Sequence, residues 1–90
     1  MKPEVLIYTT SWCPFCRREK ALLQEKGVAF TELDIEADPA HRKAMIESSG
    51  RSTVPQIFIN GTLIGGSDEL FALDVRGELD KLLGRNPPAT

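Results

Sequence analysis

Apolar residues lie along the chain in short runs and at helical spacing, separated by glycine, proline and charged residues. Residues 5–8 form a continuous apolar run, which is typical of a strand covered on both faces. Residues 14–26 mix apolar and charged positions and predict an amphipathic helix that ends at Gly27. Residues 28–35 predict a second strand, and a helix between two strands favours parallel pairing. The core candidates in this second strand are Phe30, Leu33 and Ile35.

A second helix is predicted where Asp38-Pro39 follows this strand. Aspartate is a preferred N-cap residue, and proline is favoured at the first helical position because its missing N–H needs no partner there. The helix should extend to Gly50 and turn Met45 and Ile46 toward the core.

The last part of the chain predicts a β-hairpin followed by a helix. Residues 56–59 and 62–64 are strand-like, and Asn60-Gly61 between them is a dipeptide favoured in tight hairpin turns. The final helix should break at Gly77. The order β-α-β-α-β-β-α predicts an α/β fold with a mixed sheet of about four strands flanked by helices, because the first crossover is parallel and the hairpin antiparallel.

Length and composition indicate one small domain. The 90 residues are 41% hydrophobic and 27% charged, and we expect a domain at 1–84 and a flexible tail at 85–90. The formal net charge of −2 does not support nucleic-acid binding. We recognise neither a signal-peptide apolar region nor a membrane-spanning stretch, so a cytoplasmic protein without membrane association is expected.

The strongest chemical signal is Cys13-Pro14-Phe15-Cys16, which begins the first predicted helix. If Cys13 is the N-cap, Pro14 takes the first helical position and Cys16 the third, which brings the two sulfurs within bonding reach. A sulfur at the N-cap faces unpaired N–H groups and the positive end of the helix dipole, which favour thiolate over thiol. Cys13 is therefore the expected nucleophile.

Two other interpretations of the cysteine pair are weaker. A zinc site needs about four ligands, but the chain has two cysteines and one histidine, His41. A structural disulfide between residues so close in sequence would remove little entropy from the unfolded chain. In a reducing compartment such a pair is expected to cycle between dithiol and disulfide, so redox chemistry remains and no metal is expected.

Three motifs, taken in order, resemble those of the glutaredoxins: Cys-Pro-Phe-Cys at 13–16, Thr-Val-Pro-Gln at 53–56 and Gly-Gly-Ser-Asp at 65–68. The likeness extends over residues 5–83 and is greatest to short bacterial dithiol glutaredoxins of the third type. It implies a thioredoxin-like fold with glutathione as electron donor and co-substrate. It also implies that the partners are disulfide-containing or glutathionylated proteins, and we expect a monomer.

The same resemblance assigns roles to individual residues. Cys13 would attack and Cys16 would resolve, while the Val54 backbone, in a loop with a cis proline, would pair with the glutathione cysteine. Amides at the last helix start would hold the γ-glutamyl carboxylate, and Asp68 would hold the neighbouring ammonium. Arg42 would contact the glycyl carboxylate. The glutathione site implied in this way comprises Phe15, Arg42, Thr53, Val54, Pro55, Gly66, Ser67 and Asp68.

Two alternatives for the function stay open. A thioredoxin-like reductase recharged by a flavoprotein would share the Cys-x-x-Cys helix start and the proline loop, but Gly-Gly-Ser-Asp favours glutathione. An iron–sulfur carrier, in which two subunits each supply Cys13 and a glutathione, is disfavoured by Pro14 and by the second cysteine. Thr10 stands where many family members carry a lysine, which would weaken glutathione affinity or shift the contact to Arg42 or Arg51.

Overall fold

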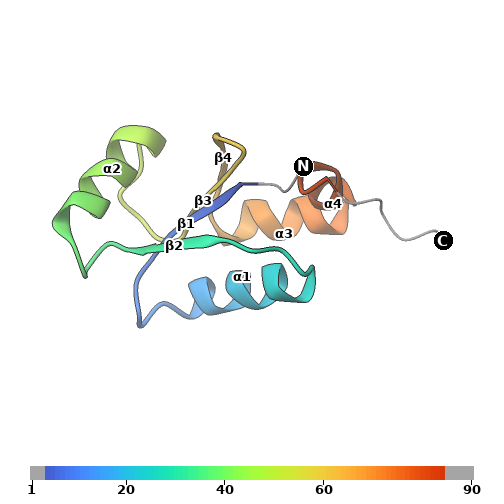
Figure 1. Ribbon diagram of the computed structural model, residues 1–90, viewed down its shortest axis with the longest axis horizontal. Coiled ribbons are helices and arrows are strands. Elements are labelled where there is room, and N and C mark those ends of the chain that lie inside the picture. The colour runs from blue at the N-terminus through green and yellow to red at the C-terminus, as the bar shows by residue number, and fades with distance from the viewer. Residues whose placement is uncertain (1–3, 85–90) are drawn as a thin grey trace.

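The computed structural model describes residues 4–84, and the predicted tail at 85–90 lies outside the described residues. Within the described range the elements follow in the order β-α-β-α-β-β-α-α. The four strands form one mixed sheet in the spatial order β2-β1-β3-β4 (Figure 1). The predicted α/β class and four-stranded mixed sheet are confirmed.

The sheet is built around β1 (Val5–Thr9), which pairs on both sides. It runs parallel to β2 (Thr31–Asp34) and antiparallel to β3 (Gln56–Ile59), which forms a hairpin with β4 (Thr62–Gly65). The Asn-Gly turn of this hairpin has φ values of 52° and 82°, the positive values that its turn type requires. Both predicted strand pairings are therefore present.

β2 is shorter than the strand predicted at 28–35. Its first paired residue is Thr31, which lies opposite Leu6. Val28 and Phe30 come before the pairing begins, yet they are partly buried and pack against the core from a loop. Their apolar character thus reflects packing against the core and not a longer strand.

The larger part of the core lies between the sheet and the helices α1 (Pro14–Glu25), α3 (Ser67–Val75) and α4 (Glu78–Leu82) (Figure 1). Alternate residues of a strand face opposite sides, and Val5 and Ile7 of β1 face these helices. A glycine with φ 76° separates α3 from α4, as predicted. The buried residues of this layer are Val5, Ile7, Leu22, Leu23, Ile57, Ile59, Leu70, Leu79 and Leu83.

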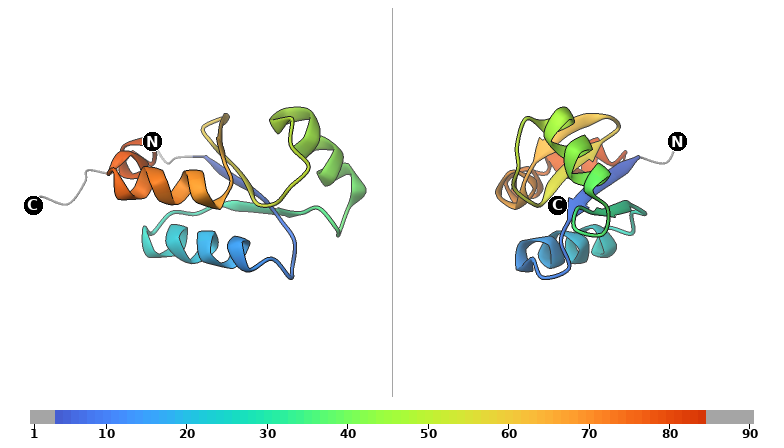
Figure 2. Two further views of the ribbon diagram at one scale, coloured as in Figure 1. Left: turned by 180° about the vertical axis from the view of Figure 1, so that it is seen from behind. Right: turned by 90° about the vertical axis from the view of Figure 1, so that its left-hand side faces the viewer.

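The opposite face of the sheet is covered by α2 (Pro39–Ser49) (Figure 2). The carboxylate of Asp38 accepts a hydrogen bond from the backbone N–H of Ala40 at 2.9 Å. Gly50 ends the helix in the left-handed conformation, with φ 73°. Both predicted ends of this helix are confirmed.

Met45 is the residue of α2 that is fully buried, and it packs with Tyr8 and Ile35 in a second, smaller core cluster. The prediction that Ile46 also faces the core is wrong, because its side chain is 41% exposed. Neighbouring residues on an α-helix lie about 100° apart around its axis. A helix that contacts the sheet along a narrow stripe can therefore bury one of the two.

We expect Met45→Ala to lower the free energy of unfolding by about 2–5 kcal/mol, because it opens a cavity beneath α2. The matched control Ile46→Ala is expected to lower it by less than about 1 kcal/mol, since Ile46 is already 41% exposed to solvent. Urea unfolding of the two variants measures the difference. Equal losses would contradict the assignment of Met45 as the anchor of α2.

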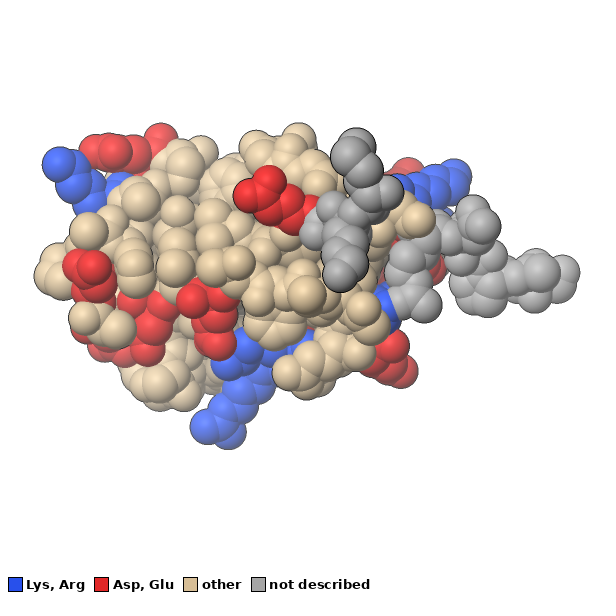
Figure 3. All heavy atoms as spheres, viewed as in Figure 1, with Lys and Arg blue, Asp and Glu red and all other residues tan. Residues whose placement is uncertain are grey.

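On the face of the molecule drawn in Figure 3, acidic side chains gather near the connection from β2 to α2, and the basic side chains lie beside acidic ones. The described residues on this face form no continuous basic stripe of the kind that binds nucleic acid. Between residues 4 and 84, no helix is long and apolar enough to cross a membrane.

Candidate active site

The N-terminus of α1 holds both cysteines. Cys13 is the N-cap, with extended backbone angles of φ −81° and ψ 113°, and Pro14 takes the first helical position. The Sγ atom of Cys13 accepts a hydrogen bond from the backbone N–H of Cys16 at 3.2 Å, and both thiols are free. The predicted capping geometry is confirmed, and it places a sulfur where helix N–H groups favour negative charge.

The two sulfurs differ in access. Cys13 is 4% exposed but lines a pocket of about 370 Å³, whereas Cys16 is 0% exposed and does not line that pocket. Burial, and after it the hydrogen bond with Cys13, raises the pKa of the Cys16 thiol to about 12. Cys13 can therefore meet a substrate sulfur first, while Cys16 stays protonated behind it.

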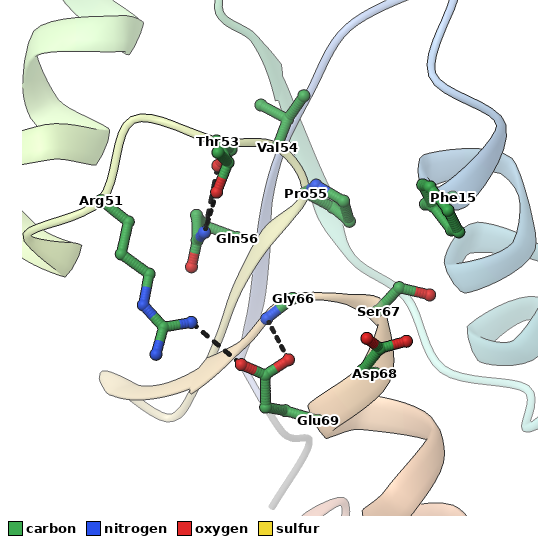
Figure 4. Close-up of a pocket in the computed structure, with 10 residues that line it drawn as sticks. All are labelled: Phe15, Arg51, Thr53, Val54, Pro55, Gln56, Gly66, Ser67, Asp68 and Glu69. Carbon is green, nitrogen blue, oxygen red and sulfur yellow. Dashed lines mark hydrogen bonds and ion pairs between the residues drawn. The ribbon is translucent and has the colours of Figure 1, made fainter.

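A second pocket, of about 220 Å³, is drawn in Figure 4. It shares a wall with the first pocket. Its sides are the loop with a cis Val54–Pro55 peptide bond and the start of α3. Phe15, Thr53 and Val54 line both pockets, so one extended ligand could reach from Cys13 to the N-terminus of α3. The second pocket is lined by Phe15, Arg51, Thr53, Val54, Pro55, Gln56, Gly66, Ser67, Asp68 and Glu69.

All eight residues of the glutathione site implied by the sequence line one of these two pockets. Arg42 lies with Cys13 in the larger pocket, and Gly66, Ser67 and Asp68 lie in the smaller one. Ser67 and Asp68 stand at the first turn of α3, on the side of the pocket opposite Thr53 (Figure 4). The fold thus gathers at one edge residues that are far apart in the chain.

Two glycines let α3 begin close to the proline loop. Gly65 has φ 120°, and a Cβ atom there would lie 2.9 Å from the side chain of Glu69. A Cβ atom at Gly66 would lie 3.3 Å from the carbonyl oxygen of Pro55, which is a tight contact. The absence of side chains at both positions therefore allows the close approach on which the smaller pocket depends.

Glu69 was not identified from the sequence, although it orders the wall of the smaller pocket. Its carboxylate accepts hydrogen bonds from the backbone N–H of Gly66 at 3.2 Å and from Nη1 of Arg51 at 3.0 Å (Figure 4). The Arg51 hydrogen bond is the main cause that lowers the pKa of Glu69. A glutamate three residues after the N-cap is the capping-box position, so the sequence held a signal for it.

Arg51 is therefore already paired, while Arg42 forms no ion pair with any residue that the structure describes. This difference leaves Arg42, of the two, available to an incoming carboxylate.

Two exposed aromatic rings flank Cys13, Phe15 at 51% and Trp12 at 68% exposure. Trp12 had no assigned role from the sequence, but it lines the larger pocket together with Cys13.

Between residues 4 and 84, no three His, Cys, Asp or Glu side chains are grouped to hold a metal ion.

Three features define the class of this protein: a mixed sheet, a Cys-x-x-Cys pair at a helix N-terminus and an adjoining cis-proline loop. Together they define a thioredoxin-like thiol–disulfide oxidoreductase. Comparison with known proteins narrows this class. The family model described as Glutaredoxin matches residues 5–64, so the chain belongs to the glutaredoxin family, the glutathione-dependent members of that class.

The chain is 60% identical to Glutaredoxin 3 of Escherichia coli (strain K12) over 79 residues, which cover 88% of this chain and 95% of that protein. The solution structure of glutaredoxin from Brucella melitensis is similar, with a TM-score of 0.79 and 51% identity over 91% of this chain and 89% of that one. A crystal structure of a buckwheat glutaredoxin–glutathione complex has a TM-score of 0.82 and 26% identity, covering 89% and 76%. The thioredoxin-like fold is thereby confirmed.

Proposed function

We propose that this protein reduces protein disulfides and releases glutathione from glutathionylated proteins, with Cys13 as the attacking thiol. The observation that carries the proposal is the free Cys13 at the α1 N-terminus, in a pocket that shares a wall with a second pocket at the start of α3. We also propose that the protein works as a monomer in the cytoplasm, where glutathione is the abundant thiol.

Release of glutathione needs one thiol of the protein. The Cys13 thiolate attacks the glutathione sulfur of a glutathionylated protein, and that protein's sulfur leaves with the electron pair. A second glutathione thiolate attacks the glutathione sulfur held by Cys13, which forms oxidised glutathione and frees Cys13. Each exchange forms one sulfur–sulfur bond and breaks another.

Reduction of a protein disulfide needs both thiols. Cys13 first becomes linked to one sulfur of the target, and Cys16 then attacks Cys13, so that the target leaves reduced. Two glutathione molecules in succession reopen the Cys13–Cys16 disulfide. The hydrogen bond from the Cys16 N–H to Cys13 Sγ supports this second step, because it shows that the two residues lie within reach of each other.

We place glutathione across both pockets. Its cysteine backbone would pair with Val54, and its γ-glutamyl carboxylate would accept hydrogen bonds from the amides of Ser67 and Asp68 at the α3 N-terminus. The Asp68 carboxylate would face the γ-glutamyl ammonium, and Arg42 would face the glycyl carboxylate at the other end. The placement of these residues around the two pockets supports the proposal.

The electron donor is tested by two coupled assays that follow NADPH oxidation. One supplies glutathione and glutathione reductase, and the other supplies a flavoprotein thioredoxin reductase without glutathione. We expect turnover with the first system and little with the second. Turnover with the flavoprotein alone would overturn the proposed use of glutathione and support a thioredoxin-like reductase.

Asp68→Asn is expected to raise the KM for glutathione by about three- to tenfold and to leave kcat nearly unchanged. The variant removes a counter-charge for the γ-glutamyl ammonium without touching either sulfur, and an exposed ion pair contributes about 1 kcal/mol. Glu25→Gln removes the same charge from the far end of α1 and is the matched control. An unchanged KM in folded Asp68→Asn protein would refute the role of Asp68.

A further inference from the structure

Glu19 of α1 is a buried carboxyl group for which the mechanism above has no use. Its side chain is 0% exposed, and neither carboxylate oxygen has a hydrogen-bond partner among the described residues. A buried carboxyl group without a partner is unfavourable for folding. Its presence therefore calls for an explanation in the chemistry of the protein.

The position of Glu19 links it to the resolving thiol. Residues three apart on a helix lie on the same face with Cβ atoms about 5–6 Å apart, and Glu19 follows Cys16 at this spacing. Cys16 and Glu19 are both 0% exposed, so the thiol and the carboxyl group share the dry face of α1 that packs on the sheet. Their charges interact, because an ionised Glu19 disfavours an ionised Cys16.

The groups that Glu19 faces do not stabilise its negative charge. Glu69 of α3 is also acidic, and it adds to the effect of burial, which is the main cause that raises the pKa of Glu19 to about 8. In the part of the chain that the structure describes, no cation forms an ion pair with Glu19; the next residue, Lys20, is paired instead with Glu32 of β2 at 2.8 Å. Glu19 therefore exchanges its proton close to neutral pH.

Cys16 requires such a group. The thiol is buried, its pKa is raised to about 12, and the thiolate is the form that attacks a disulfide. At neutral pH very little of this buried thiol is ionised. A carboxylate one helical turn away can remove the proton at the moment of attack, directly after a rotation of its side chain or through one water molecule.

We propose that Glu19 accepts the Sγ proton of Cys16 in the resolving step of the dithiol cycle, a role that rests on the proposed function. The ionised carboxylate takes the proton, the Cys16 sulfur forms a bond to Cys13 Sγ, and the bond from Cys13 to the target breaks. The target sulfur leaves with the electron pair. When glutathione later reopens the disulfide at Cys13, Glu19 returns the proton to the Cys16 sulfur.

The resolving step is measured on its own as the release of glutathione from the Cys13–glutathione mixed disulfide. The adduct is formed with oxidised glutathione at about pH 4, where closure is slow, and is then mixed into buffers between about pH 5 and pH 10. Released glutathione is quantified in acid-quenched samples. Glu19→Gln, Glu19→Asp and the matched control Glu25→Gln are compared with the unmodified protein.

For the unmodified protein and for Glu25→Gln, we expect the closure rate to rise with pH and to level off near the pKa of Glu19, about 8. Glu19→Gln is expected to close at least about tenfold more slowly at about pH 8, without this levelling, and Glu19→Asp is expected to restore part of the rate and the pH dependence. Carbon-13 NMR of the Glu19 carboxyl group in the reduced protein should show a midpoint near 8.

Two results would overturn the role of Glu19: closure of Glu19→Gln at the unmodified rate and pH profile, or faster closure, which would show that the carboxylate only repels the Cys16 thiolate. An NMR midpoint near the ordinary 4.5 would do the same. Failure of the proposed function gives a different result from failure of the Glu19 role. In that case the unmodified protein itself would not turn over a glutathione mixed disulfide with glutathione as reductant.

Discussion

Cys13→Ser is expected to abolish both activities, whereas Cys16→Ser is expected to keep release of glutathione and to lose most reduction of protein disulfides. Cys13 lines the larger pocket, and in the proposed mechanism it makes the first bond to every substrate, so no other thiol replaces it. Cys16 is fully buried, and in the proposed mechanism it acts after Cys13 has reacted. A mixed disulfide with glutathione can be resolved by a second glutathione, but a bond to a folded target needs a close second thiol.

The measurement is a pair of glutathione-coupled assays on the two variants, one with a small glutathione mixed disulfide and one with a protein disulfide. Circular dichroism of each variant controls for folding. If Cys13→Ser retained release of glutathione, or if Cys16→Ser abolished it, the assignment of attacking and resolving thiols would be wrong.

The second large effect concerns stability. The unfolding free energy is expected to fall by about 3 kcal/mol between about pH 5 and pH 7.5 on account of Glu19 alone. The pKa of this carboxyl is raised from 4.5 to about 8 by burial, and further by Glu69. Between these two values the folded protein holds a proton that the unfolded chain has released. Each pH unit in this window therefore removes up to about 1.4 kcal/mol of stability.

Urea unfolding of the reduced protein and of Glu19→Gln measures this effect. The two should be about equally stable near pH 5, where the carboxyl is neutral in the folded state, and Glu19→Gln should become the more stable as pH rises to about 8. Glu32 and Glu69 have lowered pKa values, so their stabilisation is present above 4.5 and is lost only as pH falls below it. Parallel curves for Glu19→Gln and unmodified protein would contradict the prediction.

The local chemistry of this protein followed from its sequence, because its causes are short-range. Asp38-Pro39 specifies a helix start, and Asn60-Gly61 a hairpin turn, through the backbone groups of their immediate neighbours. Cys13-Pro14 specifies a helix start at which the Cys13 sulfur is the cap, for the same reason. The α/β class followed from the order of these elements, and the motifs that resemble the glutaredoxins located the two walls of the site.

Only the tertiary structure decided which side chains lose contact with water. Met45 and Ile46 are both apolar, and the packing of α2 on the sheet buried the first and exposed the second. Glu19 is charged by type, but the packing of α1 on the core buries the helix face that it shares with Cys16. Glu69 is paired with Arg51 because α3 begins beside the proline loop, although the two residues belong to separate elements. Burial and long-range pairing depend on what lies opposite a residue, and that neighbour comes from another part of the chain.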